Sequence, residues 1–196
     1  HNDFSLNQLK TFKPLAEKIA FQLNSGVLIH ALNSAGIIRF PEFQMDMVRL
    51  GIGLYGMEAS GERIDELRTV GTLKTTISQI KKIKAGETIG YGRMGLSESE
   101  ITIATVAIGY ADGFSRAFSN GVGKMYIFGK SAPVVGNVCM DMTMLDVTGL
   151  DVETGDEVIV FGETPSIEVL AAQINTIPYE ILTNVSERVK RVYLTE

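Results

Sequence analysis

The chain contains very little cysteine or histidine and has no long apolar run. Cys139 is the single cysteine among 196 residues, so no disulfide can form within the chain. A lone thiol fits a reducing compartment and predicts a cytoplasmic protein. With only two histidines beside it, we expect no metal site of the zinc type. No apolar stretch reaches the ~18 residues of a bilayer-spanning helix, so we expect no membrane partner.

Positive charge is also scarce. The formal net charge of −5 argues against nucleic-acid binding. Lys81, Lys82 and Lys84 form the densest basic cluster. A solvated strand edge before a turn at Gly86 explains this cluster, and a phosphate site is the alternative. The chain begins with His1 and polar residues, so no signal peptide is visible and we expect a cut or processed N-terminus.

The first part of the chain alternates between helix and strand patterns. Its 196 residues, 45% of them hydrophobic and 21% charged, suffice for one or two domains with a core. Residues 5–24 predict a helix with a capping box at Ser5 and Gln8, which Pro14 should kink or restart.

Two short apolar runs follow this helix. Residues 27–30 predict a buried strand, and a second run lies at 48–55 after a turn signal at 33–36. The order helix, strand, loop, strand is typical of the last units of a β/α barrel.

After about residue 68 the chain changes to short strand-like runs divided by glycine turns, which is typical of a compact antiparallel β domain. The expected strands are 70–83, 101–108, 124–128, 132–135, 142–147, 157–161 and 189–194. One helix, at 166–174 and capped by Ser166, interrupts them. We therefore expect two domains, a barrel segment at 1–68 and a mainly β domain at 69–196, with the boundary within 60–69.

Five segments in a fixed order carry the chemistry. They are HALNSAGIIRF at 30–40, MVRLGIGLYG at 47–56, GYG at 90–92, GYADG at 109–113 and VCMDM at 138–142. In this order they resemble the C-terminal half of an alanine racemase, and the resemblance extends over nearly the whole chain. It implies the end of a barrel that binds pyridoxal phosphate, followed by the β domain of that family. It also implies interconversion of L- and D-alanine for cell-wall precursor supply.

Two loops are candidates for the phosphate of this cofactor. Backbone N–H groups and hydroxyls at the C-terminal face of a barrel suit a phosphate, and glycine lets the backbone approach an anion. Asn33 and Ser34 follow the first strand, and Gly51 and Ile52 follow the second. By themselves they are a plain turn and a packing glycine. The resemblance implies that these four surround the phosphate together with Tyr179, otherwise a surface aromatic.

Three further residues are assigned through the resemblance. It implies that Tyr91 is the catalytic base on the face opposite the cofactor lysine. Arg49 would be the partner of the ring nitrogen, and because arginine only donates, that nitrogen must accept. His30 would hydrogen-bond both Tyr91 and Arg49. Without the resemblance, the same residues are a hairpin aromatic, a surface arginine and a buried histidine.

The last two segments correspond to the mouth of the active site, which the resemblance implies is contributed by the partner subunit of a homodimer. Tyr110 would limit the size of the substrate. Met140 would present a backbone N–H to the substrate carboxylate, with Asp141 beside it. The alternatives are a plain turn at 112–113 and core packing at 139–140.

The sequence also departs from the family. The cofactor lysine, a carboxylate-positioning arginine and a substrate-side histidine find no match, and Lys74, Lys81 and Lys130 lie in the β region without a suitable counterpart. We therefore expect this chain alone to be inactive. Two other functions stay open, a racemase of another small amino acid such as serine and a stand-alone β module for dimerisation or regulation.

Overall fold

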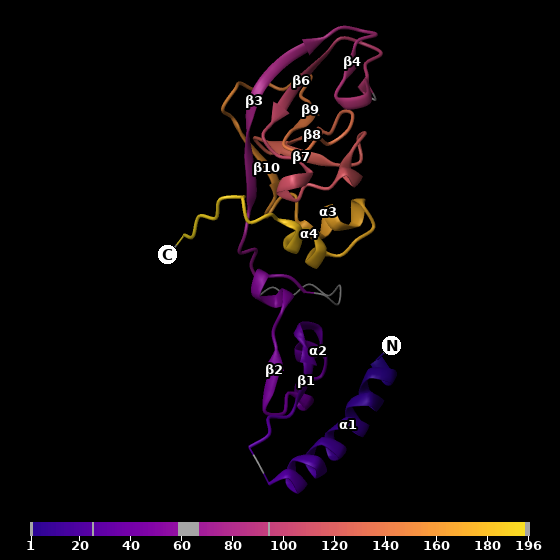
Figure 1. The fold of residues 1–196 in the computed structure, drawn as a ribbon, viewed down its shortest axis with the longest axis vertical. Coiled ribbons are helices and arrows are strands. Elements are labelled where there is room, and N and C mark those ends of the chain that lie inside the picture. The colour runs from indigo at the N-terminus through magenta and orange to yellow at the C-terminus, as the bar shows by residue number, and fades with distance from the viewer. Residues whose placement is uncertain (1, 25, 59–66, 94, 195–196) are drawn as a thin grey trace. The chain divides into compact units, whose positions relative to one another are not determined.

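The structure, a computed structural model, describes residues 2–24, 26–58, 67–93 and 95–194. Contacts divide the chain into two compact units, residues 1–70 and 71–196 (Figure 1). The boundary expected at 60–69 falls mostly on residues 59–66, which lie outside the described residues. Within the described ranges, no helix combines the length and the hydropathy that a bilayer crossing requires.

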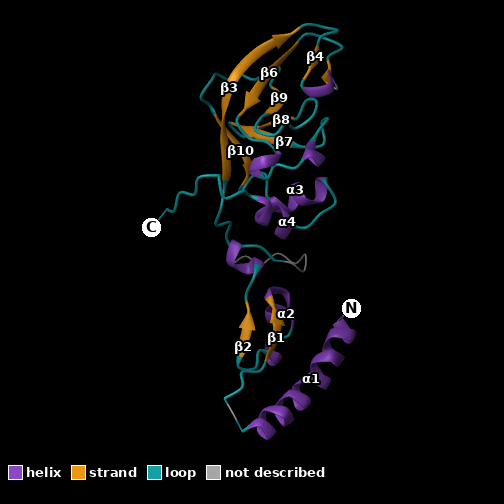
Figure 2. Ribbon diagram, in the orientation of Figure 1, coloured by secondary structure: helices purple, strands orange, loops and turns teal. Residues whose placement is uncertain are grey.

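The first unit contains one long helix and a short parallel strand pair (Figure 2). Its helices are α1 (Asn2–Leu23) and α2 (Ser34–Arg39), and its strands are β1 (His30–Asn33) and β2 (Met47–Arg49). The 3₁₀ turns η1 (Pro41–Phe43) and η2 (Ile52–Tyr55) flank β2. Leu9, Leu32 and Phe43 form the core that joins α1 to the strands. The parallel strand–helix–strand order agrees with the β/α units expected from the sequence.

Four local predictions in this unit are wrong. Ser5 lies inside α1, which begins at Asn2, so Ser5 is not a cap. The helix also continues through Pro14 without the predicted restart. The first strand begins at His30 instead of residue 27, because the backbone of Ile29 is bonded to Asp46 by a side-chain and a backbone contact. The turn expected at 33–36 is the first turn of α2.

The second unit is built on a six-stranded sheet of order β8-β7-β10-β3-β6-β9, with antiparallel pairing throughout. The strands are β3 (Leu73–Ile83), β6 (Ile101–Val106), β7 (Lys124–Ile127), β8 (Lys130–Pro133), β9 (Thr143–Asp146) and β10 (Glu157–Phe161). An antiparallel bridge between Val134 and Leu145 links the ends of the two edge strands, so the sheet curls into a nearly closed barrel. This confirms the mainly β domain.

Strand β3 connects the two halves of this barrel. Its first residues, Leu73–Thr76, pair with β10, and the residues from Ile77 to Ile83 pair with β6. Ile83 also packs with Ile89, Ile103 and Met144 in a buried cluster at one end. Lys81, Lys82 and Lys84 are exposed, as expected for a solvated edge before the turn at Gly86.

Short elements complete the second unit. Strands β4 (Thr88–Ile89) and β5 (Gly95–Leu96) form a small hairpin, and helices α3 (Ile167–Gln173) and α4 (Pro178–Asn184) pack on each other. Ser166 precedes α3 as predicted, although its side chain makes no capping hydrogen bond. The sequence prediction missed α4, whose first residue is a proline.

The final strand expected at 189–194 is wrong. These residues follow the turn at Ser186–Val189 without pairing, and Val192, Tyr193 and Leu194 are largely exposed. Arg191 donates to the carbonyl of Val189, so a side chain takes up a backbone acceptor that a strand ladder would use.

Candidate active site

The two loops expected to hold a phosphate meet in the first unit. Ser34 is buried, and its hydroxyl accepts hydrogen bonds from the backbone N–H of Gly51 at 2.8 Å and of Gly53 at 3.4 Å. The loop that follows β1 is therefore tied directly to the loop that follows β2. Ile52, between the two donors, is 1% exposed and anchors the second loop in the core.

Asn33 fixes the direction of the first loop. Its side-chain oxygen accepts from the N–H of Gly36 at 3.0 Å, which makes Asn33 the N-cap of α2. The loop thus places a helix N-terminus and a buried hydroxyl at the same end of β1. Such an arrangement presents backbone donors to an anion.

Arg49 and His30 lie on the neighbouring strands. Arg49, opposite Asn33 in the strand pair, donates from Nη2 to the carbonyl of Ala31 at 2.9 Å. A guanidinium has several donors, so this bond holds the side chain and leaves donors for a ligand. Nδ1 of His30 is buried and has no hydrogen-bond partner among the described residues. A buried imidazole nitrogen of this kind requires a polar partner.

Tyr91 lies on a tight turn of the second unit, between β4 and β5. The turn is closed by a hydrogen bond from the N–H of Arg93 to the carbonyl of Gly90 at 3.2 Å. The side chain of Asn137 donates to the carbonyl of Tyr91 at 3.4 Å, and Arg93 donates to the hydroxyl of Thr88 at 3.2 Å. The phenol itself is presented outward, with 81% of the residue exposed.

The loops that carry Tyr110 and Met140 lie against each other. The N–H of Tyr110 donates to the carbonyl of Cys139, and that of Ala111 to the carbonyl of Met140, each at 3.0 Å. A Cβ at Gly109 would come within 2.3 Å of the carbonyl oxygen of Cys139, so only glycine permits this approach. Tyr110 and Met140 remain 42% and 54% exposed, which excludes core packing for Met140.

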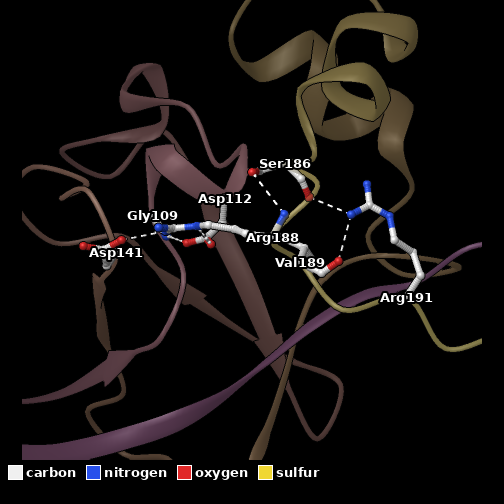
Figure 3. A network of polar contacts seen from close by, with 7 residues as sticks. All are labelled: Gly109, Asp112, Asp141, Ser186, Arg188, Val189 and Arg191. Atoms are coloured by element: carbon white, nitrogen blue, oxygen red, sulfur yellow. Dashed lines mark hydrogen bonds and ion pairs between the residues drawn. The ribbon is translucent and has the colours of Figure 1, made fainter.

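The sequence prediction did not find the residue that joins these loops. Arg188 donates from Nε to Asp112 at 2.7 Å and from Nη2 to Asp141 at 2.6 Å (Figure 3). Its hydrogen bonds to Asp112 and then to Asp141 raise the pKa of the guanidinium further above its ordinary value. The only signal in the sequence was the turn pair at 112–113, which does not identify a partner 76 positions away.

Tyr179 lies on α4, at the second position of the helix, and is 38% exposed. Its carbonyl accepts from the hydroxyl of Thr183 at 2.8 Å. The predicted site residues thus form one group in the first unit and others in the second. The expected contacts of Tyr91 with His30, and of Tyr179 with a phosphate held by Ser34, would join the two units and stay predictions.

Comparison with known proteins places this geometry in a family context. The family model described as "Alanine racemase, N-terminal domain" matches residues 1–59, and that described as "Alanine racemase, C-terminal domain" matches residues 70–193. An alanine racemase of Desulfosudis oleivorans is 40% identical over 195 residues, which cover 95% of this chain and 50% of that protein. One from Clostridium tetani is 44% identical over 176 residues, or 85% of this chain and 45% of that protein.

Solved structures give the same picture. The alanine racemase of Bartonella henselae with covalently bound pyridoxal phosphate matches with a TM-score of 0.88 and 35% identity, over 97% of this chain and 52% of that one. The alanine racemase of Clostridium difficile 630 in complex with cycloserine matches with a TM-score of 0.88 and 39% identity, over 99% and 52%. The chain spans about half the length of the curated relatives it matches.

Proposed function

We propose that this chain, which belongs to the alanine racemase family, is the C-terminal half of an enzyme that interconverts L- and D-alanine. The observation that carries the proposal is a hydrogen bond between the loops that follow β1 and β2. In it, the hydroxyl of Ser34 accepts from the N–H of Gly51, which lies 17 positions later in the chain. The choice of alanine as the substrate is supported by relatives that are named alanine racemase and are about 40% identical over nearly the whole chain. We refer below to the complete enzyme as the whole protein.

Pyridoxal phosphate is the cofactor of this proposal, and the residues of the first unit fit it. The N-terminus of α2, capped by Asn33, and the hydroxyl proton of Ser34 would donate to the phosphate, while Gly51, whose N–H is already donated to Ser34, and Ile52 would let the backbone approach it. Tyr179 would add a phenol from the second unit. When bound, the cofactor supplies an electron sink that makes the Cα–H bond of an amino acid acidic.

Arg49 would hold the pyridine nitrogen of the cofactor. The guanidinium is already held by its bond to the carbonyl of Ala31, so less side-chain conformational entropy is lost when it donates to the cofactor. Because arginine keeps its protons, the nitrogen that it faces stays an acceptor. Nδ1 of His30, which is buried and has no partner in the part of the chain that the structure describes, supports a polar link to this side chain, and in our proposal the link includes Tyr91.

Tyr91 would move the proton at Cα on one face of the substrate. Its outward-facing phenol, on a turn fixed by Asn137 and Arg93, is accessible to a ligand. A lysine on the opposite face, supplied by the other half of the whole protein, would carry the second proton transfer. Tyr110, Met140 and Asp141 would bind and limit the substrate at the mouth of the partner subunit's site in a homodimer.

The proposed function also implies a domain organisation, a cellular compartment and a use for the product. Residues 1–68 would complete a β/α barrel, and residues 69–196 would form the β domain. The unpaired thiol of Cys139 supports a cytoplasmic enzyme, and its D-alanine would supply cell-wall precursors.

The test is conversion of L-alanine by the whole protein loaded with pyridoxal phosphate, followed by chiral separation of the product. We expect D-alanine, formed faster than D-serine from L-serine. Faster turnover of serine would show that serine, and not alanine, is the preferred substrate. The absence of both activities would contradict the proposal.

A further inference from the structure

We propose that Arg188 is a positioning residue that sets the spacing of the two loops at the mouth of the active site. It would thereby determine how well the enzyme binds the carboxylate of alanine and how strictly it rejects larger amino acids. The inference rests on the proposed function, because Tyr110 and Met140 are substrate residues only in that function.

The geometry of Arg188 is that of a bridge. One guanidinium holds a carboxylate from each loop, Asp112 at 2.7 Å and Asp141 at 2.6 Å (Figure 3). Asp112 lies two positions after Tyr110, and Asp141 directly follows Met140. Two charge-assisted bonds to a rigid planar group fix both distance and angle, which a single charged bond does not.

The loop side of the bridge is also held by Asp112 itself. The second oxygen of Asp112 accepts from the N–H of Gly109 at 2.9 Å, so its carboxylate closes the turn that presents Tyr110. The Asp112 side chain is only 15% exposed. A shift of this carboxylate would therefore move the backbone of Tyr110.

The C-terminal segment is built to hold Arg188 in place. The N–H of Ser186 donates to the carbonyl of Asp112 at 3.1 Å, and a Cβ at Gly113 would come within 2.3 Å of the carbonyl oxygen of Asn184. Arg191 then donates to the carbonyls of Val185 and Ser186 at 3.0 and 2.6 Å. The turn that carries Arg188 is thus fixed to the Tyr110 loop independently of the bridge.

Charge gives the bridge its effect on the substrate. With Arg188 in place, two acidic side chains share one positive charge. Without it, two like charges remain on neighbouring loops, where they repel each other and the incoming carboxylate. Because this interaction acts on the bound substrate and on the transition state alike, its loss should raise KM more than it lowers kcat.

The test is Arg188→Met in the whole protein, with Lys190→Met as the matched control. Lys190 is an exposed cation in the same segment. For Arg188→Met we expect a KM for alanine about 10- to 100-fold higher, which corresponds to about 1.4–2.8 kcal/mol of lost binding. The ratio of kcat/KM for alanine to that for serine should fall, and the rise in KM should shrink as salt is added. Lys190→Met should change neither quantity.

Two further measurements keep the inference falsifiable. Asp141→Asn removes one arm of the bridge and should reproduce the change in the alanine-to-serine ratio even if Arg188→Met does not fold. Arg188→Lys keeps the charge but cannot hold both carboxylates in one plane. We expect its KM for alanine to depend on salt as in the wild type, while the ratio of kcat/KM for alanine to that for serine stays low. Hydrogen exchange at the N–H groups of Tyr110 and Ala111 should accelerate in Arg188→Met, whether or not the protein racemises alanine.

An unchanged substrate ratio in both Arg188→Met and Asp141→Asn would overturn the inference. So would unchanged exchange at Tyr110 and Ala111, or an equal effect of Lys190→Met. If the wild-type whole protein fails to racemise alanine, the proposed function fails, while faster exchange in Arg188→Met would still support the bridge between the loops.

Discussion

The hydroxyl of Ser34 accepts the backbone N–H of Gly51 at 2.8 Å, although one residue follows β1 and the other follows β2. The bond joins the ends of two parallel strands through the side chain of a buried residue. It therefore holds the two strand ends together and leaves the hydroxyl proton of Ser34 to donate to a ligand.

Ser34→Ala tests this edge. The substitution leaves the N–H of Gly51 without its acceptor, so we expect the first unit to lose about 1–3 kcal/mol of unfolding free energy. In the whole protein, the affinity for pyridoxal phosphate should fall with it. Asn33→Ala is the comparison for stability, because it removes the cap of α2, at about 1 kcal/mol, and leaves the bond to Gly51. Urea unfolding gives the stabilities and cofactor titration the affinity, and an unchanged cofactor affinity in Ser34→Ala would argue against a role for Ser34 in holding the phosphate.

The 196-residue chain alone should neither racemise alanine nor attach pyridoxal phosphate at one specific lysine. The reason is that no lysine of this chain corresponds to the cofactor lysine of the family. The measurement is mass spectrometry after borohydride reduction and dialysis, beside a chiral assay. A single modified lysine in stoichiometric yield would show that the chain carries its own attachment site.

Tyr91→Phe should separate the two proton transfers in the whole protein. The change removes the phenol oxygen and keeps the ring, so the chemical step should slow by about 10²–10⁴. Exchange of the Cα proton with solvent deuterium should persist for the enantiomer served by the lysine and fail for the other. His30→Gln should give a milder loss. Equal slowing of exchange for L- and D-alanine would mean that Tyr91 is not the second base.

Gly113→Ala should destabilise the second unit more than Gly121→Ala. Both glycines have positive φ, 107° and 84°, so each alanine adds backbone strain of about 1–2 kcal/mol. At Gly113 the new Cβ also meets the carbonyl oxygen of Asn184 at 2.3 Å, whereas nothing lies within 4 Å at Gly121. The steric conflict should add about 1–3 kcal/mol in thermal unfolding. Matching losses would mean that the segment at Asn184 moves away freely.

The strands of the second unit could be predicted because each is a short apolar run between turn residues. Glu157–Phe161 was found to the residue, and β3, β6, β7 and β9 within a few positions. The strand at 189–194 failed because apolarity alone does not supply a pairing partner. Helix α4 was missed because Pro178 reads as a breaker, although proline at the first helical turn costs nothing.

Residues of the candidate site could be predicted from the sequence only where they belong to a short, continuous motif. The segments around Asn33 and Gly51 each carry their own signal, and the structure adds the bond between them. Arg188 has no local signal, since its partners Asp112 and Asp141 lie 76 and 47 positions away. Charged residues of this kind look like ordinary surface until the fold brings them together.

The divided pairing of β3 has a consequence for the order in which the chain is made. During synthesis β3 leaves the ribosome before both of its partners, and β6 then covers only the part from Ile77 onward. Leu73–Thr76 keep an open edge until β10 has been synthesised at Glu157–Phe161. An open edge pairs readily with another chain. Lys74, which forms an ion pair with Glu157 in the folded unit, places a charge on this edge during the interval. Nascent chains stalled before β10 should therefore aggregate more when Lys74 is replaced by an apolar residue.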